Sequence, residues 1–277
     1  MCKWTRRRLE CKIQMGKGGD FLANYHLNVA PISRGKGHSV TKRANYISGK
    51  RLRDDYNDKT YYRKRDDVMY NKIYLPAHAP PEFSDLQSLC DSIEKAEKRW
   101  DARTAREFKC SLPNELPLRE QIKIVNEFVM NNFVRYDLCA IVAIHEGRNI
   151  DDPKRNNPHV HIIVPTRTVD SDGFSKKKDR EHDKRKYVVV WREQWALAQN
   201  RAYERNGLDI RVSHESLEVQ GIRDREPTIH ISRIDWQREK RGERTRSGDK
   251  KREIKKRNLE RKRQSEKERE IERDRSR

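Results

Sequence analysis

Three histidines carry the clearest chemical signal in the sequence. His159 and His161 flank Val160 at the start of an apolar run, and His145 ends the apolar segment before it. Because strand residues two apart point to the same face, His159 and His161 would project together while Val160 packs on the other face. Three neutral imidazoles leave open positions on a metal ion, so these histidines are predicted ligands. The alternative is that they are half-buried structural histidines with satisfied ring nitrogens.

Tyr46 is the candidate nucleophile beside such a metal site. On a helix its i−4, i−3 and i+4 neighbours are Lys42, Arg43 and Lys50, which form a cationic stripe. Nearby positive charge favours the phenolate and would also hold a phosphodiester. An ordinary surface tyrosine is the alternative interpretation. Other tyrosines lie in a basic segment further on, where a pair could stack on bases: Tyr56, Tyr61 and Tyr62.

The segments that would position these residues include strands and helices without a regular β-α-β order. Strands are expected at 24–30, 107–112, 138–145 and 159–164, and helices at 40–48, 86–96, 118–129 and 191–205. Pro31 is expected to break the first strand, and 54–74 is a polar, tyrosine-rich stretch. The pattern predicts an α+β fold with a mostly antiparallel central sheet, flanking helices and a hairpin of 138–145 with 159–164 at its centre.

Charge divides the chain into three parts. The 277 residues carry a formal net charge of +20, and hydrophobic residues make up only 33%, which points to a polyanionic partner and to segments outside any core. Residues 237–277 hold 19 Lys/Arg and 10 Asp/Glu and form a predicted tail that is helical or disordered. Residues 1–20 form a basic N-terminal extension, and 21–236 the expected folded domain.

Cysteine usage and hydropathy argue against three further classes: disulfide-stabilised proteins, thiolate zinc proteins and membrane-spanning proteins. The five cysteines are odd in number and contain no C-x-x-C pair, which argues against a disulfide framework and a thiolate zinc site. The longest purely apolar run, 138–144, is too short to span a bilayer. We therefore expect a protein of a reducing cytosol with no membrane insertion.

Several motifs, in order over residues 25–231, together resemble the MobA/MobL family of plasmid mobilization relaxases. They are Tyr25-His26-Leu27, the Ser33-Arg34-Gly35-Lys36-Gly37 turn, Ala44-Asn45-Tyr46-Ile47-Ser48-Gly49, Phe108 to Leu116, Ala143-Ile144-His145-Glu146, Asn157-Pro158-His159-Val160-His161, and His214-Glu215-Ser216-Leu217 with Gln220-Gly221-Ile222.

This resemblance implies an HUH-type, single-tyrosine relaxase palm in the domain 21–236. It implies that Tyr46 is the nucleophile, that His145, His159 and His161 hold the metal, and that Glu107 assists the tyrosine or orients the site. The family usually has a second acid two residues after this glutamate, where this chain has a lysine. The expected DNA-binding residues are Arg34, Lys36, Lys42, Arg43 and Lys50.

The implied reaction nicks one DNA strand at a plasmid origin of transfer, forms a 5′-phosphotyrosine and later rejoins the strand. Magnesium or manganese is the implied cofactor. The implied partners are single-stranded or hairpin origin DNA, accessory mobilization proteins, and a coupling protein with a type IV secretion system, in the bacterial cytoplasm. Two alternatives remain open at this point: a rolling-circle replication initiator with the same chemistry, and a non-catalytic nucleic-acid-binding protein.

Overall fold

The structure is a computed structural model that describes residues 25–149, 152, 156–223, 225–229 and 231–275. The chain divides into two compact units, the first ending at His214 and the second covering Glu215–Arg277. The boundary expected after residue 236 therefore lies inside the second unit. Within the described residues, no helix is long and apolar enough to cross a bilayer.

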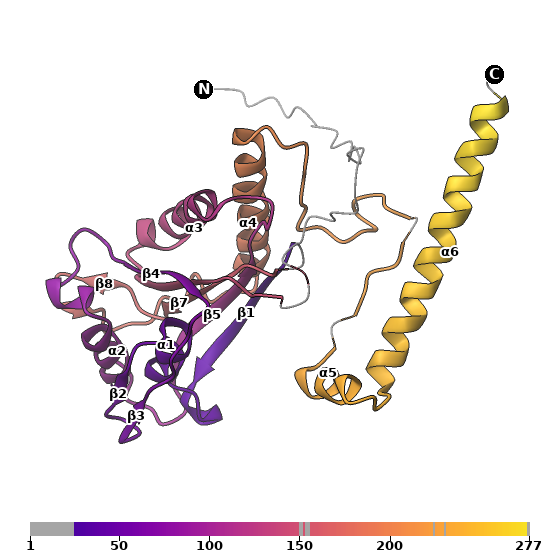
Figure 1. Cartoon of the computed structure of the whole chain (residues 1–277). Coiled ribbons are helices and arrows are strands. Elements are labelled where there is room, and N and C mark those ends of the chain that lie inside the picture. The colour runs from indigo at the N-terminus through magenta and orange to yellow at the C-terminus, as the bar shows by residue number, and fades with distance from the viewer. Residues whose placement is uncertain (1–24, 150–151, 153–155, 224, 230, 276–277) are drawn as a thin grey trace, which may run out of the picture. The chain divides into compact units, whose positions relative to one another are not determined.

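The first unit is built on a five-stranded sheet in the order β1-β5-β7-β6-β4, and all of its neighbours pair antiparallel (Figure 1). Its strands are β1 (Leu27–Ser33), β4 (Val68–Tyr74), β5 (Arg103–Ser111), β6 (Ala140–His145) and β7 (His159–Pro165). Two small hairpins lie outside it, β2 (Leu52–Asp54) with β3 (Lys59–Tyr61) and β8 (Val169–Asp170) with β9 (Gly173–Phe174). The predicted α+β class and the central β6–β7 hairpin are confirmed.

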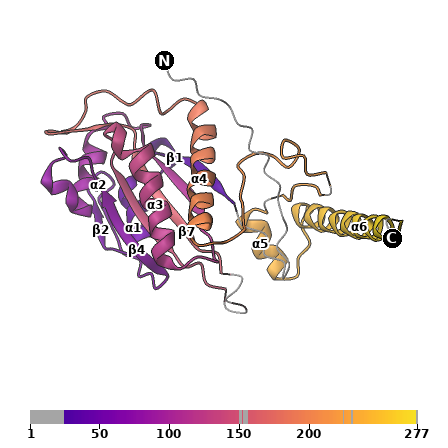
Figure 2. The ribbon, with the colours of Figure 1, turned by 90° about the horizontal axis from the view of Figure 1, so that it is seen from above.

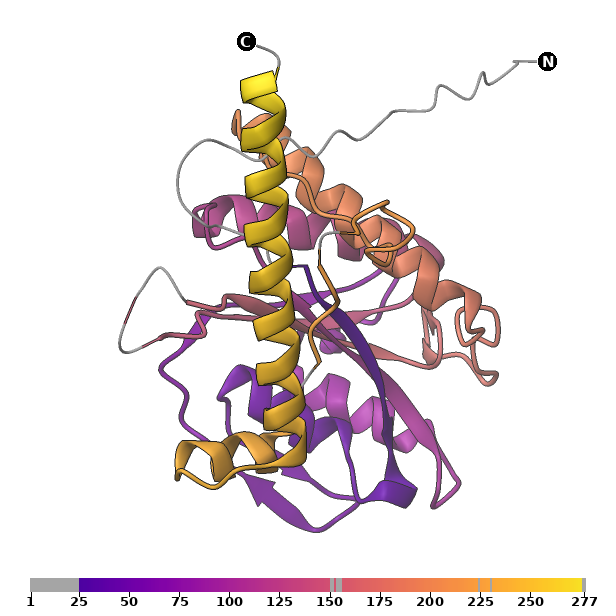
Figure 3. The same ribbon diagram turned by 90° about the vertical axis from the view of Figure 1, so that its right-hand side faces the viewer.

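Helices cover both faces of the sheet. Helices α1 (Val40–Ser48) and α2 (Leu86–Lys95) pack on one face, and α3 (Leu118–Asn132) and α4 (Lys186–Arg205) on the other (Figures 1 and 2). Seen from the side, the strands separate the two helix pairs (Figure 3). This gives two cores, one on each face of a single sheet.

Strand alternation assigns each side chain of β5 to one of these cores. Phe108 and Cys110 are fully buried against α3 and α4, where Phe108 meets the Trp191 ring edge-on at 4.9 Å between centroids. Ala105 belongs to the core under α1 and α2. The polar residues Glu107 and Lys109 share the parity of Ala105, so the strand presents them on the α1/α2 face.

Helix α1 has the start and stop signals that its sequence predicts. The Ser39 side chain accepts a hydrogen bond from the Lys42 N–H at the N-cap, and Gly49 ends the helix with φ 70°. Val40, Ala44 and Ile47 are all buried on its inner face. These caps fix where the helix begins, and hence which side chains turn toward the sheet.

One sequence expectation about strands was wrong, and one strand was not predicted. β1 runs through Pro31 to Ser33, because it is an edge strand whose outer side needs no N–H donor. The polar stretch 54–74 contains the opposite edge strand, β4, paired with β6. The alternation of apolar and polar residues in β4 is hard to recognise in the sequence. An edge strand with exposed positions carries polar residues where a central strand carries apolar ones.

The second unit contains α5 (Arg233–Lys240) and the 30-residue helix α6 (Arg246–Arg275), the yellow helix of Figure 3. Of the two states predicted for the tail, the structure has the helical one. Within the unit, the Glu226 carboxylate pairs with Arg257 and Arg261, both at 2.9 Å, and joins the preceding segment to α6. Exposed ion pairs of this kind stabilise only weakly, so α6 is a solvated, charged helix.

Arg34 lies in a buried ion pair and not on the surface. Its guanidinium donates to the Glu94 carboxylate at 2.7 and 2.9 Å and to the Glu97 carbonyl at 2.8 Å, and both charged side chains are almost inaccessible. The second Glu94 oxygen accepts from the Val40 N–H at 2.8 Å. The pair therefore joins the turn after β1 to the first turn of α1 and to α2, and the structure places the guanidinium of Arg34, an expected DNA-binding residue, inside the fold.

Replacing Arg34 with alanine should lower the free energy of unfolding by about 3–5 kcal/mol, because Glu94 keeps a buried charge without its partner. Urea denaturation followed by circular dichroism measures this. Lys36→Ala is the matched control, since this exposed lysine lies two residues along the same turn. Equal losses in the two variants would contradict a structural role for Arg34.

Candidate metal centre and tyrosine

The β6–β7 pairing brings the three predicted histidines together. His145 lies directly opposite His159 in the antiparallel register, and His161 lies opposite Ala143, two residues along. All three side chains point to the α1/α2 face, and one ring nitrogen from each lies within 4.8 Å of the others. His145 and His161 are buried and His159 is partly exposed, so the cluster has one side open to solvent.

Hydrogen bonds fix which nitrogen of each imidazole keeps a lone pair. Each ring has one nitrogen within hydrogen-bond distance of an oxygen: Nε2 of His145 to the Ile47 carbonyl at 2.8 Å, Nδ1 of His159 to the Asn157 carbonyl at 2.8 Å, and Nδ1 of His161 to the Glu107 carboxylate at 2.9 Å. Those nitrogens must carry the proton, because carbonyl and carboxylate oxygens only accept. The opposite nitrogen of each ring keeps its lone pair.

The second nitrogen of His145 shows that the cluster fits a cation. Its Nδ1 is buried and has no hydrogen-bond partner among the described residues. A buried acceptor without a partner costs free energy, and a metal ion shared with His159 and His161 would satisfy it. The donor set is three neutral imidazoles, each held in orientation by an oxygen acceptor, which is the usual arrangement for metal-binding histidines.

Burial keeps these histidines neutral. Desolvation lowers the pKa of His145 and of His159 from 6.5 to about 4, opposed in each case by the backbone hydrogen bond. It also lowers the pKa of His161, despite the adjacent Glu107. At neutral pH all three rings therefore offer the deprotonated nitrogen that metal binding needs.

A backbone contact at the ends of the loop between β6 and β7 helps to set the position of His159. Gly147 follows β6 with φ 60°, and its carbonyl accepts from the Asn157 N–H at 2.9 Å. A Cβ on this glycine would overlap the Asn157 carbonyl oxygen, so no other residue fits there without a backbone shift. The Asn157 carbonyl also accepts the hydrogen bond that orients His159. Gly147 therefore helps to position a predicted metal ligand, a role that sequence analysis missed.

Tyr46 projects from α1 toward the histidines. Its ring meets the His161 ring edge-on, with 6.1 Å between centroids, and among the described tyrosines it is the one whose ring contacts the cluster. Three guanidinium groups lie over the Tyr46 ring, at 4.7 Å for Arg43, 5.1 Å for Arg63 and 4.8 Å for Arg65. The arrangement combines a phenol, a metal-ligand cluster and concentrated positive charge.

The surrounding cations change the acidity of the phenol. Burial raises the pKa of Tyr46, but the hydrogen bond from Arg65 and the charges of Arg65, Arg43 and Lys109 outweigh burial and lower the pKa below its usual value of 10.0. Arg65 is itself held by Asp67, with Nε donating to the carboxylate at 2.8 Å. Sequence analysis missed Arg63, Arg65 and Asp67, and their regular two-residue spacing just before β4 was the available signal.

Glu107 links the histidines to the tyrosine helix. Its Oε1 accepts from Nδ1 of His161 and from the Arg43 guanidinium. Burial raises the Glu107 pKa, but these hydrogen bonds and charges lower it overall, so the carboxylate stays ionised. Of the two roles the resemblance implies for Glu107, this geometry favours orienting the site, because its contacts are to His161 and Arg43.

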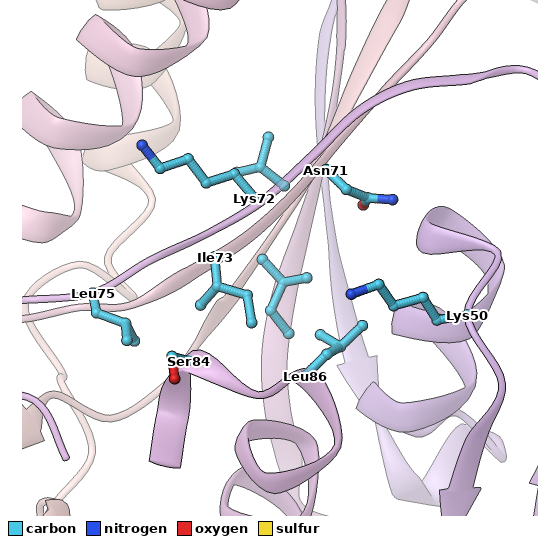
Figure 4. A pocket seen from close by; sticks show the side chains of 9 residues that line it. Lys50, Asn71, Lys72, Ile73, Leu75, Ser84 and Leu86 are labelled. Carbon is cyan, nitrogen blue, oxygen red and sulfur yellow. The ribbon is translucent and has the colours of Figure 1, made fainter. Parts of the chain in front are cut away.

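The other expected DNA-binding lysines lie in different places. Lys42 is exposed on α1, with its ammonium 5.9 Å from the centre of the Tyr61 ring. Lys50 follows α1 and lines a pocket of about 260 Å³ beside β4, where Figure 4 shows its ammonium directed toward Ile73 and Leu86. Lys36 is exposed in the turn that follows β1. Ser33, the last residue of β1, pairs with Arg103 at the end of β5 that lies away from the histidines.

A sequence profile of the MobA/MobL family matches residues 38–241. The chain belongs to the MobA/MobL family. The matched span includes Tyr46, Glu107 and the three histidines, so the family assignment and the side-chain cluster concern the same part of the molecule.

Relatives and a solved structure agree with this assignment. A "Probable mobilization protein MobA" of Bifidobacterium longum (strain NCC 2705) is 30% identical over an alignment of 252 residues, gaps included, that covers 76% of this chain and 43% of that protein. A "Mobilization protein MobL" of Acidithiobacillus ferridurans is 30% identical over an alignment of 238 residues, gaps included, that covers 76% of this chain and 62% of that protein. This MobA/MobL chain thus spans less than two thirds of the length of those relatives.

The fold has a counterpart among solved structures. A structure titled "Molecular Basis of Vancomycin Resistance Transfer in Staphylococcus aureus" superposes with a TM-score of 0.62 at 27% identity, and covers 70% of this chain and 100% of that chain. The likeness confirms the fold expected for the MobA/MobL resemblance.

Removing the carboxylate that orients His161 should weaken metal binding. We expect Glu107→Ala to lower Mn²⁺ affinity about 10–100-fold, because His161 loses the acceptor that fixes its tautomer and ring plane. Isothermal titration calorimetry measures the affinity. Glu146→Ala is the control, since the Glu146 side chain bonds Arg148. Equal affinities in Glu107→Ala and the unmodified protein would rule out the orienting role.

The neutral histidines should also make the metal-free protein sensitive to acid. Between pH 6.5 and about 4 the unfolded chain binds a proton at His145 that the folded chain does not, so the free energy of unfolding falls as the pH is lowered through this window. If the unfolded chain binds one proton more than the folded chain, the free energy of unfolding changes by about 1.4 kcal/mol per pH unit. Urea titrations across this range should show a shallower slope for His145→Phe, and an unchanged slope would show that His145 titrates normally.

Proposed function

We propose that this chain is a relaxase that nicks one DNA strand at a plasmid origin of transfer by tyrosine transesterification. The observation that carries the proposal is the contact of the Tyr46 ring with a cluster of three histidines. Arginine guanidinium groups lie over the same ring. The names of the relatives, mobilization proteins MobA and MobL, support the same function. The first unit, described from residue 25 to His214, would carry the reaction.

The proposed chemistry exchanges one phosphodiester for another. The Tyr46 oxygen attacks the phosphorus of the scissile phosphate, the bond from phosphorus to the 3′-oxygen breaks, and the phenol proton passes to solvent while the leaving 3′-oxygen takes one up. The product is a 5′-phosphotyrosine and a free 3′-hydroxyl. Because the bonds made and broken are similar in energy, the step runs in reverse and the strand can be rejoined.

The arginines have two tasks in this step. Arg43 and Arg65 lower the pKa of Tyr46, which raises the fraction of the nucleophilic phenolate. With Arg63 they also form a cationic surface above the ring that would hold the phosphate against the tyrosine. Lys42, on the exposed side of α1, would contact the flanking backbone.

His145, His159 and His161 would hold a divalent cation, magnesium or manganese. When bound, such an ion supplies positive charge that stabilises the phosphate oxygens as the transition state forms. Glu107 holds His161 in position through its Nδ1–H, and Ile47 and Asn157 do the same for the other two rings. The chain's own contribution is thus to fix the tautomers of three imidazoles whose ring nitrogens lie within 4.8 Å of one another.

The proposed partners follow from this function. Single-stranded or hairpin DNA at the origin of transfer is the substrate, and accessory mobilization proteins and a coupling protein with a type IV secretion system would move the strand from the bacterial cytoplasm. The basic second unit, with its charged helix α6, would add contacts to flanking DNA.

We expect Tyr46→Phe to abolish the covalent adduct with DNA while leaving DNA affinity nearly unchanged, because only the attacking hydroxyl is removed and the arginines stay. A labelled single-stranded origin oligonucleotide, incubated with the protein and Mn²⁺ and run on a denaturing gel, reveals the adduct, and peptide mass analysis locates it.

Tyr61→Phe is the matched control, since Tyr61 lies in β3 near Lys42 and has no ring contact with the histidines among the described residues. An adduct that persists in Tyr46→Phe, or that maps to Tyr61 or Tyr62, would overturn the assignment of the nucleophile. Metal-dependent binding without any adduct in the unmodified protein would favour a non-catalytic nucleic-acid-binding protein.

A further inference from the structure

A hollow lined by basic side chains lies between the end of α2, the segment before β5 and the segment that includes β9. It has a volume of about 880 Å³. Basic side chains dominate its lining, with a single acid: Lys95, Lys98, Arg99, Arg167, Lys176, Lys177, Lys178, Arg180 and Glu97. We call this surface the distal groove. All of its residues belong to the first unit.

Most cations of the distal groove are not neutralised by the protein. Glu97 pairs with Arg167 at 2.8 Å and with Lys178 at 3.1 Å. These two cations are therefore neutralised and join the segment after β7 to the end of α2. The remaining lysines and Arg180 have no ion pair among the described residues, and Lys176 and Lys177 are exposed. Uncompensated positive charge lining a concave surface attracts an extended anion.

An exposed tryptophan stands next to this charge. Trp100 follows Arg99 in the turn before β5, and 73% of its surface is accessible, which is unusual for so large an apolar ring. A Cβ at Gly35 would lie 3.8 Å from the Trp100 ring, so the ring borders the turn that carries Lys36. Trp100 thus lies beside the groove, next in the chain to Arg99, a lining residue whose guanidinium pairs with Asp101 at 2.9 Å.

The distal groove is separate from the histidine cluster. Lys178 donates to the Arg103 carbonyl at the first residue of β5, whereas His161, the histidine whose ring Tyr46 contacts, pairs with Lys109 further along the same strand. At about 3.3 Å per residue, the six residue steps between Arg103 and Lys109 place the two surfaces roughly 20 Å apart along the sheet. A strand that fills both surfaces must therefore be longer than one that covers only the nick.

We propose that the distal groove binds single-stranded DNA, with the lysines on the phosphates and a base stacked on Trp100. Cations interleaved with an exposed aromatic ring are the combination by which proteins hold single strands without reading sequence. A duplex offers no exposed base face to the ring, which is why a single strand is the better occupant. The inference extends the proposed function, on which it rests, by giving the same DNA strand a second anchor.

The test compares metal-free binding of the full chain to single-stranded oligonucleotides of two lengths, by fluorescence anisotropy over a salt series. We expect Lys176→Gln with Lys177→Gln to reduce the magnitude of the slope of log K against log salt by about 0.7 for each phosphate that the protein no longer neutralises, on the long strand only. Lys72→Gln with Lys123→Gln removes the same charge from exposed lysines of β4 and α3 and should leave the slope unchanged.

Trp100→Leu tests the stacking separately. It should weaken binding of the long single strand about five-fold or more without changing the salt slope, because no charge is removed. Slopes in the groove variant equal to those in the control variant, together with full affinity in Trp100→Leu, would overturn the proposal. Tighter binding of duplex than of single strand that depends on the groove lysines would overturn the choice of occupant.

A separate readout distinguishes this inference from the proposed function. Adduct formation with Mn²⁺ on a short oligonucleotide that covers only the nick should be the same in the groove variants and the unmodified protein. If no adduct forms but the groove variants still bind the long strand more weakly, the proposed function fails and the distal groove stands. If adducts form and the groove variants bind the long strand normally, the distal groove fails alone.

Discussion

The antiparallel register of β6 and β7 is the constraint on which the site depends. It sets His145 opposite His159 and places His161 one diagonal step away, all on the face covered by α1 and α2. A slip of one residue would turn one strand's imidazoles into the opposite core, since strand side chains alternate. The apolar residues between them, buried on both faces, enforce this register, and the close backbone contact of Gly147 with Asn157 holds together the two ends of the loop that joins the strands.

The site also depends on a balance between burial and charge. Burial keeps the histidines neutral and their lone pairs free, while the nearby arginines act on the more exposed phenol of Tyr46 in the opposite sense, favouring its anion. Glu107 stands between the two groups and contacts both, accepting from His161 and from Arg43. One carboxylate thereby holds the histidine side and the tyrosine side of the site in a single hydrogen-bonded unit.

Basic residues have different roles in different places, although composition counts them alike. Arg34 is an internal tie between the turn after β1 and α2, Arg65 is braced by Asp67 beside the tyrosine, and Lys176 remains exposed in the distal groove. Burying a guanidinium is tolerated only where a carboxylate and carbonyls satisfy it, as Glu94 and Glu97 do for Arg34. Net charge indicates a polyanionic partner, but only the location of each cation shows which ones can meet it.

The sequence by itself determined the features with local causes: the Ser39 and Gly49 ends of α1, the apolar β6–β7 hairpin, and the shared face of His159 and His161. Tertiary structure decided what depends on distant partners. Arg34 is buried because Glu94 lies across from it, β4 is a strand because β6 offers an edge, and Arg63 and Arg65 belong to the site because the segment before β4 passes over Tyr46. A residue's own type and spacing encode periodicity and caps, whereas burial and pairing are set by residues far away in the chain.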